Sequence, residues 1–575
     1  MDPVPVMSDT SAGVRRVSPA VSAGRGWRAA RASLRQAPLL WGLSSAVVAL
    51  LLLPTVYLAL RSADAGPATW AMLLQPRVLA VAFNSLALAA GVTLGSALIA
   101  VPLAWLTVRS DLPGRTTWAV LAALPLVIPS YVAAYLIVSA LGPRGIVQQW
   151  LEPLLGIQRL PSIYGFPGAL FVLTLLCYPY TYLSVRAALL RLDPAQEEAS
   201  RSLGVGAWPT FWRVTLPHLR PALAAGSLLV ALYCLRDFGA VSILRFDTFT
   251  RVIYVQYQSA FDRTAAAVLS IVLVVLTIVI LAAEMRTRGR AHFDRAGAGV
   301  ARRAPQVALG RWRWLAFGGC VLLIGFALVL PTAVLGFWLV RGLAAGVNVA
   351  GLGVMTANSL TAAGLAALVA VAAALPVTWL AARRSSRGSR VLEQLTYLGY
   401  ALPGIVVALA LVFFATRAAP RLYQTWALLI AAYVILFLPQ AIGALRSALL
   451  QVHPSVEEAA RSLGRSPGQV VWSITLPLVR PGAAAALALV FLTTVKELPA
   501  TLILGPLDFK TLATAIWTAV SEAYFAQAAV PALLLIVLSS LPMALLMLDE
   551  QGFARRRRAS SARPVGSVAE FEVST

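Results

Sequence analysis

The sequence predicts an all-α membrane protein with about twelve spanning helices, arranged as two homologous six-helix bundles. Hydrophobic residues make up 59% of the 575 residues and charged residues only 12%, with a mean hydropathy of +0.79. This composition is too apolar for a soluble domain of such length. About twelve windows reach the ~20 apolar residues that a membrane-spanning helix needs. The second half of the chain also repeats segments of the first.

The predicted spans fall six to each half of the chain. In the first half they cover residues 39–60, 80–108, 117–141, 168–189, 221–244 and 264–284. In the second half they cover residues 313–340, 357–381, 392–415, 425–449, 480–504 and 526–548.

These spans divide the chain into two membrane domains joined and flanked by basic segments. The N-terminal segment is rich in Ser, Ala, Gly, Pro and Arg and has no apolar period, which is typical of a disordered tail. The predicted organisation is a cytoplasmic tail (1–38), a first membrane domain (39–285), a basic cytoplasmic linker (286–312), a second membrane domain (313–550) and a cytoplasmic tail (551–575).

The net charge of +24 reflects membrane topology rather than nucleic-acid binding, because no soluble domain is available to carry a basic face. With the N-terminus in the cytoplasm, most of the 47 Lys and Arg residues fall in the tails and inner loops. That is the positive-inside asymmetry of an inner membrane. We therefore expect a multi-pass protein of the bacterial inner membrane with both termini in the cytoplasm.

The internal repeat extends through the membrane spans. The segment NSLALAAGVTLGSALIAVPLAWLTVRS from Asn84 aligns with NSLTAAGLAALVAVAAALPVTWLAARR from Asn358, and it pairs Arg109 with Arg383. The offset falls from 274 here to 260 at the next matched span, so the first half carries 14 extra residues in the outer loop at 142–167. Six spans separate the copies, so both start on the same side. We expect two parallel halves related by a pseudo-two-fold axis along the membrane normal.

Two predicted cytoplasmic loops are near copies of each other. We call residues 193–221 loop 1 and residues 453–481 loop 2. Loop 1 contains EEASRSLGVGAWPTFWRVTLPHLRP from Glu197, and loop 2 contains EEAARSLGRSPGQVVWSITLPLVRP from Glu457. In each, a Pro opens a short helix that a Gly closes. A second amphipathic stretch follows, which we expect the Leu-Pro pair to terminate.

The spacing in these loops resembles the cytoplasmic EAA loop of permease subunits of ATP-binding-cassette importers. In that family the loop docks into a cleft of the ATPase subunit. The resemblance implies coupling roles for Glu198, Ala199, Gly204, Glu458, Ala459 and Gly464. Small residues at Ala199, Ser200, Ala459 and Ala460 would let the partner approach closely. A surface-lying amphipathic connector is the alternative for one copy, and the second copy favours coupling.

The chain lacks the residues of a nucleotide-hydrolysing enzyme. A phosphate-binding loop needs Gly-Lys followed by Ser or Thr, but the two lysines, Lys496 and Lys510, follow Val and Phe. ATP must therefore be bound and hydrolysed by another polypeptide, and we predict neither a cofactor nor an enzyme active site in this chain. Cys177, Cys234 and Cys320 lie in apolar runs, so we assign them to packing and assign no metal site.

A second pair of repeated segments follows the fifth span of each half. LRDFGAVSILRFDTFTRVIYVQY from Leu235 aligns with VKELPATLILGPLDFKTLATAIW from Val495, pairing Arg236 with Lys496 and Asp237 with Glu497. Burying ionisable groups so close to apolar runs costs free energy, so such groups are by default candidates for a functional role. Asp237 and Glu497 are therefore candidates for the translocation path. A local ion pair or a helix-end anchor at the interface is an equal alternative.

The DFG and KELPAT strings resemble the fused, twelve-span ferric-iron permeases of the same superfamily. The resemblance implies a permease that imports ferric iron together with a periplasmic binding protein and two copies of an ATPase, one for each loop. Carboxylates suit a hard cation such as ferric iron. Two alternatives stay open: a fused permease for thiamine or another small solute, and an ion-coupled secondary transporter, which also has two related halves.

Overall fold

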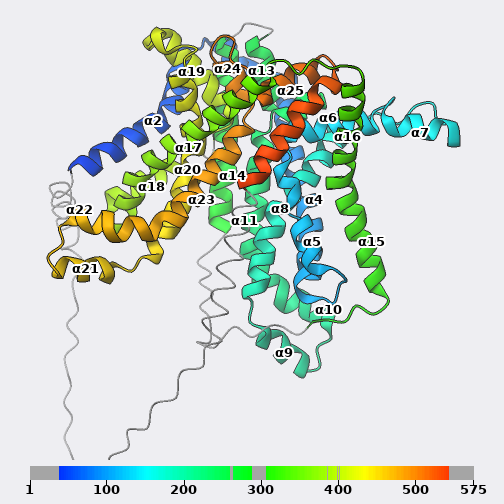
Figure 1. The fold of residues 1–575 in the computed structure, drawn as a ribbon, viewed down its shortest axis with the longest axis horizontal. Helices are drawn as coiled ribbons and strands as arrows, with labels where there is room; N and C mark the ends of the chain where they lie inside the picture. The colour runs from blue at the N-terminus through cyan, green and yellow to red at the C-terminus, as the bar shows by residue number, and fades with distance from the viewer. Residues whose placement is uncertain are drawn as a thin grey trace, which may run out of the picture.

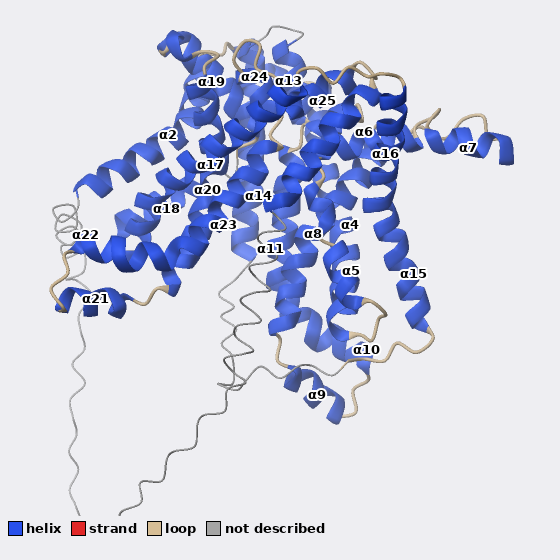
Figure 2. Cartoon of the chain, viewed as in Figure 1, coloured by secondary structure: helices blue, strands red, loops and turns tan. Residues whose placement is uncertain are grey.

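In the computed structural model, the described part of the chain comprises residues 38–258, 263–287, 306–384, 386–397, 399 and 402–542. Within it, Figure 2 shows helices and loops, with a single isolated bridge between Ser110 and Val307 as the extended element. Residues 1–37 of the predicted N-terminal tail (1–38), the predicted C-terminal tail (551–575) and most of the linker lie outside the described residues.

The first half contains α2 (Pro38–Ala63), α3 (Pro67–Ala71), a 3₁₀ turn (Met72–Leu74), α4 (Pro76–Arg109), α5 (Arg115–Leu121), a 3₁₀ turn (Leu124–Val127), α6 (Ser130–Leu141), α7 (Ile146–Leu155), α8 (Phe166–Arg191), α9 (Pro194–Ser202), α10 (Ala207–Thr210), a π turn (Phe211–Thr215), α11 (Leu216–Arg236), α12 (Gly239–Ile243), α13 (Phe249–Gln258) and α14 (Arg263–Thr287).

The second half contains α15 (Trp312–Ile324), a π turn (Gly325–Val329), α16 (Leu330–Ala344), α17 (Leu352–Arg383), α18 (Arg387–Thr396), α19 (Gly404–Ala418), a 3₁₀ turn (Pro420–Leu422), α20 (Trp426–Gln451), α21 (Pro454–Ser462), α22 (Pro467–Val470), a π turn (Val471–Thr475), α23 (Leu476–Val495), α24 (Pro499–Leu504), α25 (Leu512–Ser521) and a last apolar helix (Phe525–Pro542).

The predicted fold class is confirmed. Eleven apolar helical segments of the described residues are long enough to cross a membrane, one of which joins α6 and α7 (Ser130–Leu155), and the shorter apolar helix α19 occupies the remaining predicted position. In Figure 1 the two halves meet at the upper side of the view and diverge below, where they end in α9–α10 and in α21–α22.

The prediction of continuous third spans at 117–141 and 392–415 is wrong. The first is interrupted between α5 and α6, and the second between α18 and α19, so the spanning helices begin only at Ser130 and Gly404. In each case a Pro precedes the new helix, and Pro129 and Pro403 both have φ −63° and ψ 147°. Because Pro excludes the residue before it from the helical region, the helix must restart there.

Irregular backbone at membrane depth is tolerated where protein surrounds it. Residues 130–140 of α6 and residues 404–413 of α19 are all buried, so these helices form the centre of the molecule and face little lipid. A helix in that position can be short because its ends do not need to reach the water on both sides of the membrane.

The fifth spans also differ from the predicted 221–244 and 480–504. Leu-Pro does not terminate the second helix of either loop: α10 and α22 continue through π turns into α11 and α23 as apolar helices Trp208–Arg236 and Gly468–Val495. Pro lacks an N–H and clashes with the carbonyl four residues earlier, and a widened turn relieves both problems without ending the helix. A third π turn precedes Leu330-Pro331 in the same way.

Matching hydrogen bonds show that the two halves share one internal design. Asn84 Nδ2 donates to the carbonyl of Asp247 (3.1 Å), and Asn358 Nδ2 donates to that of Lys510 (3.0 Å). The next residue along, Ser85 or Ser359, accepts from the backbone N–H that begins α13 or α25, at 3.0 and 2.9 Å. The same contact therefore ties the second span to the outer helix in both halves.

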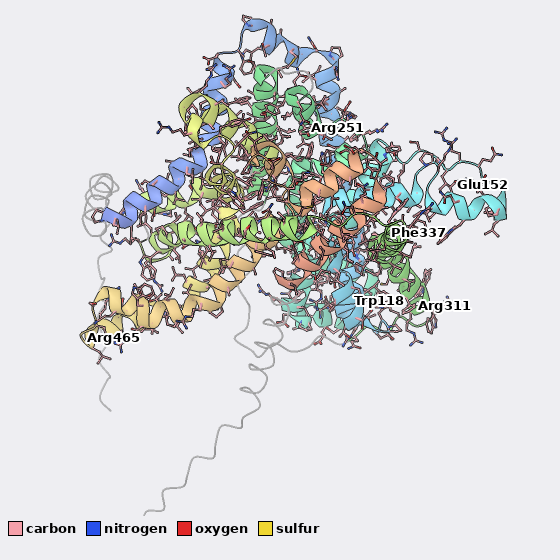
Figure 3. All side chains as sticks on the ribbon, turned by 45° about the horizontal axis from the view of Figure 1, so that its top comes forward. Trp118, Glu152, Arg251, Arg311, Phe337 and Arg465 are labelled. Atoms are coloured by element: carbon pink, nitrogen blue, oxygen red, sulfur yellow. The ribbon has the colours of Figure 1, made fainter. Side chains whose placement is uncertain are left out.

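The first helix of each half packs against the other half, which the sequence does not predict. In α2, Tyr57 meets Phe414 of α19 with ring centroids 6.0 Å apart. In the opposite direction, Phe317 of α15 meets Trp118 of α5 at 5.4 Å, and Phe326 meets Phe171 of α8 at 5.8 Å. Trp118 and the residues leading into α15 are correspondingly close in Figure 3, where Arg311 is labelled beside it. The two bundles are thus interlocked by an exchange of helices.

Candidate functional site

Loops 1 and 2 each consist of a short helix, a glycine turn and a second helix. In loop 1, the Asp193 carboxylate caps α9 by accepting from the N–H of Ala195 at 3.0 Å. The helix ends at Gly204, whose φ is +82°, and Gly464 has φ +85° at the same place in loop 2. A Cβ at either glycine would meet nothing within 4 Å. Glycine is therefore favoured here by the left-handed backbone and not by crowding.

The exposed face of each short helix carries the residues that the sequence predicts to couple. Glu198 and Ala199 are exposed on α9, and Glu458 and Ala459 are exposed on α21. The leucines before the turn are more exposed still, Leu203 by 82% and Leu463 by 84%. These leucines extend the exposed face that each loop presents.

The second small residue of each pair lies on the inner side, contrary to the prediction that it helps a partner to approach. The Ser200 hydroxyl lies 3.0 Å from that of Thr210 within the same loop. Ala460 is only 6% exposed. Small side chains at these two positions let the two helices of one loop pack closely together.

An arginine braces each loop against the membrane domain: Arg109 is buried, and Arg383 is largely shielded from solvent. In loop 2, Arg383 Nη2 lies 2.7 Å from the Glu457 carboxylate, which also accepts from the Thr475 hydroxyl at 3.0 Å. The same arginine nitrogen donates to the carbonyl of Val452, at the end of α20, at 3.1 Å. One side chain from the end of α17 thus holds the end of the fourth span, the short helix and the start of the fifth span.

Loop 1 contains the same brace in a looser form. Arg109 Nη2 lies 3.7 Å from the Glu197 carboxylate and 3.5 Å from the carbonyl of Leu192. The Thr215 hydroxyl donates to Glu197 at 2.9 Å. Sequence reasoning chose the neighbouring Glu198 and Glu458 and missed this brace. Arg109/Arg383 and Thr215/Thr475 are matched positions of the repeat, but both glutamates of each loop are matched too, so the repeat alone does not single out Glu197 and Glu457.

The carboxylates predicted to line the path lie at helix N-termini inside the molecule. Asp237 accepts from the N–H groups of Ala240 (3.0 Å) and Val241 (3.3 Å), so it caps α12, and Ser130 at the start of α6 is within its hydrogen-bonding reach. Glu497 accepts from the N–H of Ala500 at 3.3 Å, and its carboxylate occupies the space where a Cβ of Gly404, at the start of α19, would lie.

The positions of Asp237 and Glu497 account for the interruptions in the third spans. Each interruption turns the N-terminus of α6 or α19 toward the carboxylate that follows the fifth span of the same half. Helix N-termini stabilise negative charge through their free N–H groups and their dipole. Serine and glycine are the residues that allow such close approach, and they are Ser130 in one half and Gly404 in the other.

The basic partners of these carboxylates reach across to the opposite half. Lys496 Nζ donates to the carbonyl of Leu126, in the interruption of the first half's third span, at 3.0 Å. Arg236 lies close enough to Glu497 for their charges to interact. The four ionisable residues 236, 237, 496 and 497 therefore gather at the junction of the two halves.

The chain matches a known family twice. The family described as "binding-protein-dependent transport system inner membrane component" matches residues 96–285 and 374–553. Each match contains one cytoplasmic loop with its brace and one carboxylate at the half–half junction.

Relatives that match most of the chain include permeases named for ferric-iron transport. The chain is 36% identical to the Fe(3+)-transport system permease protein FbpB 2 of Haemophilus influenzae, over 86% of this chain and 95% of that protein. It is 26% identical to the ferric transport system permease protein FbpB of Actinobacillus pleuropneumoniae, over 73% of this chain and 63% of that protein. A sulfate transport system permease protein, CysW of Synechococcus elongatus, is 32% identical over 28% of this chain and 59% of that protein. With two family matches and a relative of nearly full length, the chain belongs to the inner-membrane components of binding-protein-dependent transport systems, as a fused form with both membrane domains in one polypeptide.

Proposed function

We propose that this chain forms the membrane pathway of an importer that carries ferric iron from the periplasm to the cytoplasm. The observation that carries the proposal is the 36% identity to an Fe(3+)-transport permease, which spans both fused halves and 95% of that protein. The sulfate transport relative matches only 28% of this chain, so its substrate is less strongly supported.

The energy comes from a separate ATP-binding subunit. Loops 1 and 2 each dock one copy of it, through Glu198, Ala199 and Gly204 in loop 1 and Glu458, Ala459 and Gly464 in loop 2. Leu203 and Leu463 add apolar contact area at the same surfaces. This chain binds no nucleotide and no cofactor of its own, and both of its termini lie on the cytoplasmic side with the loops. A periplasmic binding protein delivers the substrate to the opposite face.

The brace makes each loop a rigid extension of the bundle. When the two ATPase subunits close on ATP, they pull the loops together, and Arg109 and Arg383 pass that displacement to α4 and α17. The two halves then change between inward-open and outward-open arrangements, and ATP binding to the partner shifts this equilibrium.

In this proposal iron is the transported substrate, and the carboxylates that line the pathway assist its passage. Within the part of the chain that the structure describes, no group of three or more His, Cys, Asp or Glu side chains is placed to hold a metal ion. Asp237 and Glu497 supply negative charge at the junction between the halves, where a hard cation would pass.

Reconstitution tests the substrate directly. Vesicles containing this chain, its ATPase and its binding protein should take up radiolabelled ferric iron in an ATP-dependent manner, and thiamine should not compete. Uptake of thiamine in place of iron would identify a small-solute permease. Transport by the chain without any ATPase would identify an ion-coupled secondary transporter, and either result would reject the proposal.

Conservative substitutions of the two carboxylates distinguish a role in iron passage from a role in capping a helix. An amide oxygen can still accept the capping N–H, so Asp237→Asn and Glu497→Gln should assemble normally while iron uptake falls about tenfold, the effect of losing about 1.4 kcal/mol of interaction with the cation. Asp237→Ala should also reduce the amount of folded complex, because it leaves buried N–H groups unpaired at a cost of about 1–3 kcal/mol. Assembly is measured by co-purification with the ATPase. Normal uptake by both amide variants would remove these residues from the path.

A further inference from the structure

The outer-loop helix α7 has an apolar face that the bundle does not cover. Its residues turn by about 100° each, which gathers Ile146, Val147, Trp150, Leu151, Leu154 and Leu155 on one side. Gln149 and Glu152 lie on the other side. Trp150 is 67% exposed and Leu154 78%, and Leu155 is exposed to a similar degree.

This helix is held in a defined position at its beginning. Ile146 and Gln148 are buried, and the Gln148 amide donates to the carbonyls of Ile157 (3.2 Å) and Gln158 (3.0 Å) and to the Glu152 carboxylate (2.8 Å). These bonds fasten the returning chain alongside the helix. The exposed apolar face is therefore a fixed surface of the protein.

The position of α7 points to the membrane rather than to a delivering protein. Figure 1 shows α7 running crosswise to the spanning helices, beside the upper part of α16 and to the side of the outer loops around α13, α24 and α25. Figure 3 likewise places Glu152 of α7 beyond Phe337 of α16. A binding protein that docks over the outer end would not cover a helix that projects sideways.

Helix α16, beside which α7 lies in Figure 1, also carries exposed apolar side chains. Val340 and Leu343 of α16 are exposed, as expected of side chains that contact lipid. Trp338 of the same helix donates to Ser139 of α6 at 2.5 Å, which fixes α16 beside the helix that leads into α7. Exposed arginines flank α7 at Arg144 and Arg159. Amphipathic helices with aromatic residues and flanking basic residues are typical of the lipid headgroup region.

We propose that α7 lies parallel to the bilayer at its periplasmic surface, where lipid meets water. Trp150, Leu154 and Leu155 would be inserted among the lipid headgroups and upper acyl chains. The helix belongs to the 14 extra residues of the first half, whose counterpart in the second half is the short connection between α19 and α20. The anchor is therefore one-sided: it fixes the outer end of the first half to the bilayer and leaves the second half without an equivalent.

Spin labels on the two faces of α7 test the proposal. The full chain carrying Leu154→Cys or Gln149→Cys is labelled with a nitroxide in nanodiscs of phosphatidylethanolamine and phosphatidylglycerol. The three native cysteines are buried, and the unsubstituted protein gives the labelling background. Collision with oxygen, which concentrates in lipid, should exceed collision with water-soluble Ni(II)EDDA at position 154. The ratio should be reversed at position 149.

Equal accessibility to Ni(II)EDDA at both positions would overturn the proposal. So would a label at position 154 that reports water until the binding protein is added and is then shielded, because α7 would then be a docking surface for that protein. The outcome does not depend on the transported substrate, since the labels report only where the helix lies.

Discussion

Arg383→Ala should reduce ATP-driven uptake by at least about tenfold while the ATPase continues to hydrolyse ATP. Glu457 is only 4% exposed, and Arg383 is the cation that balances its charge, at 2.7 Å. Removing one partner of a buried ion pair costs roughly 3–5 kcal/mol. The least costly response is for α21 to swing away from α17 and expose the carboxylate to water. Loop 2 would then still bind the ATPase but would no longer move the membrane helices with it.

Uptake and ATP hydrolysis measured together in vesicles check this expectation, and loss of stimulation by the binding protein is the sign of uncoupling. Arg390→Ala serves as the matched control, because Arg390 is an exposed arginine on the adjoining helix α18. Arg109→Ala should have a smaller effect, since its distance to Glu197 is 3.7 Å. Arg383→Lys should restore part of the activity by returning the charge without the planar guanidinium. Wild-type uptake by Arg383→Ala would show that the brace does not couple.

The membrane spans and the repeated loops could be predicted because their signals are local. A run of apolar residues reports a spanning helix wherever it occurs, and Pro and Gly report the start and end of α9 and α21 through their own backbone preferences. The packing of α2 and α15 on the opposite halves has no such local signal in the sequence. An apolar helix has the same sequence pattern whichever bundle it packs on, so only tertiary contacts such as Tyr57 with Phe414 reveal it.

The effect of proline on the helices was predicted wrongly in two opposite ways. At Pro217 and Pro477 it was expected to end a helix, yet a π turn carries the helix past it. At Pro129 and Pro403 a single continuous span was expected, yet the helix restarts. The residue is the same, but its surroundings differ: the second pair lies where the restarted helix begins beside Asp237 or Glu497.

The choice between adjacent glutamates shows where sequence reasoning about the loops ends. Neighbouring residues of a helix point about 100° apart, so only one of Glu197 and Glu198 can face the bundle. Nothing in the loop itself says which one. The answer depends on where α4 ends, because Arg109 at that end selects Glu197 and leaves Glu198 exposed.

Replacing both exposed leucines, Leu203→Asp together with Leu463→Asp, should abolish stable association with the ATPase while the membrane domain remains folded. The two side chains are 82% and 84% exposed, so the free chain loses no packing when they change. Burying a leucine contributes about 1.5–3 kcal/mol, which corresponds to a roughly 10- to 100-fold loss of affinity at each loop. An aspartate there adds the cost of burying an unpaired charge. Co-purification and titration of the ATPase with the chain in nanodiscs measure the loss.

The matched control is Leu507→Asp, because Leu507 is 79% exposed in the loop after α24, at the end of the molecule away from loops 1 and 2. It should bind the ATPase normally. The single variants should each lose part of the affinity, since each loop docks its own subunit. Tight binding by the double variant would show that the exposed leucines lie outside the docking surface, and the contact would then have to rest on the polar face that Glu198 and Glu458 present. The comparison therefore measures how much of the docking energy is apolar and how much comes from charge.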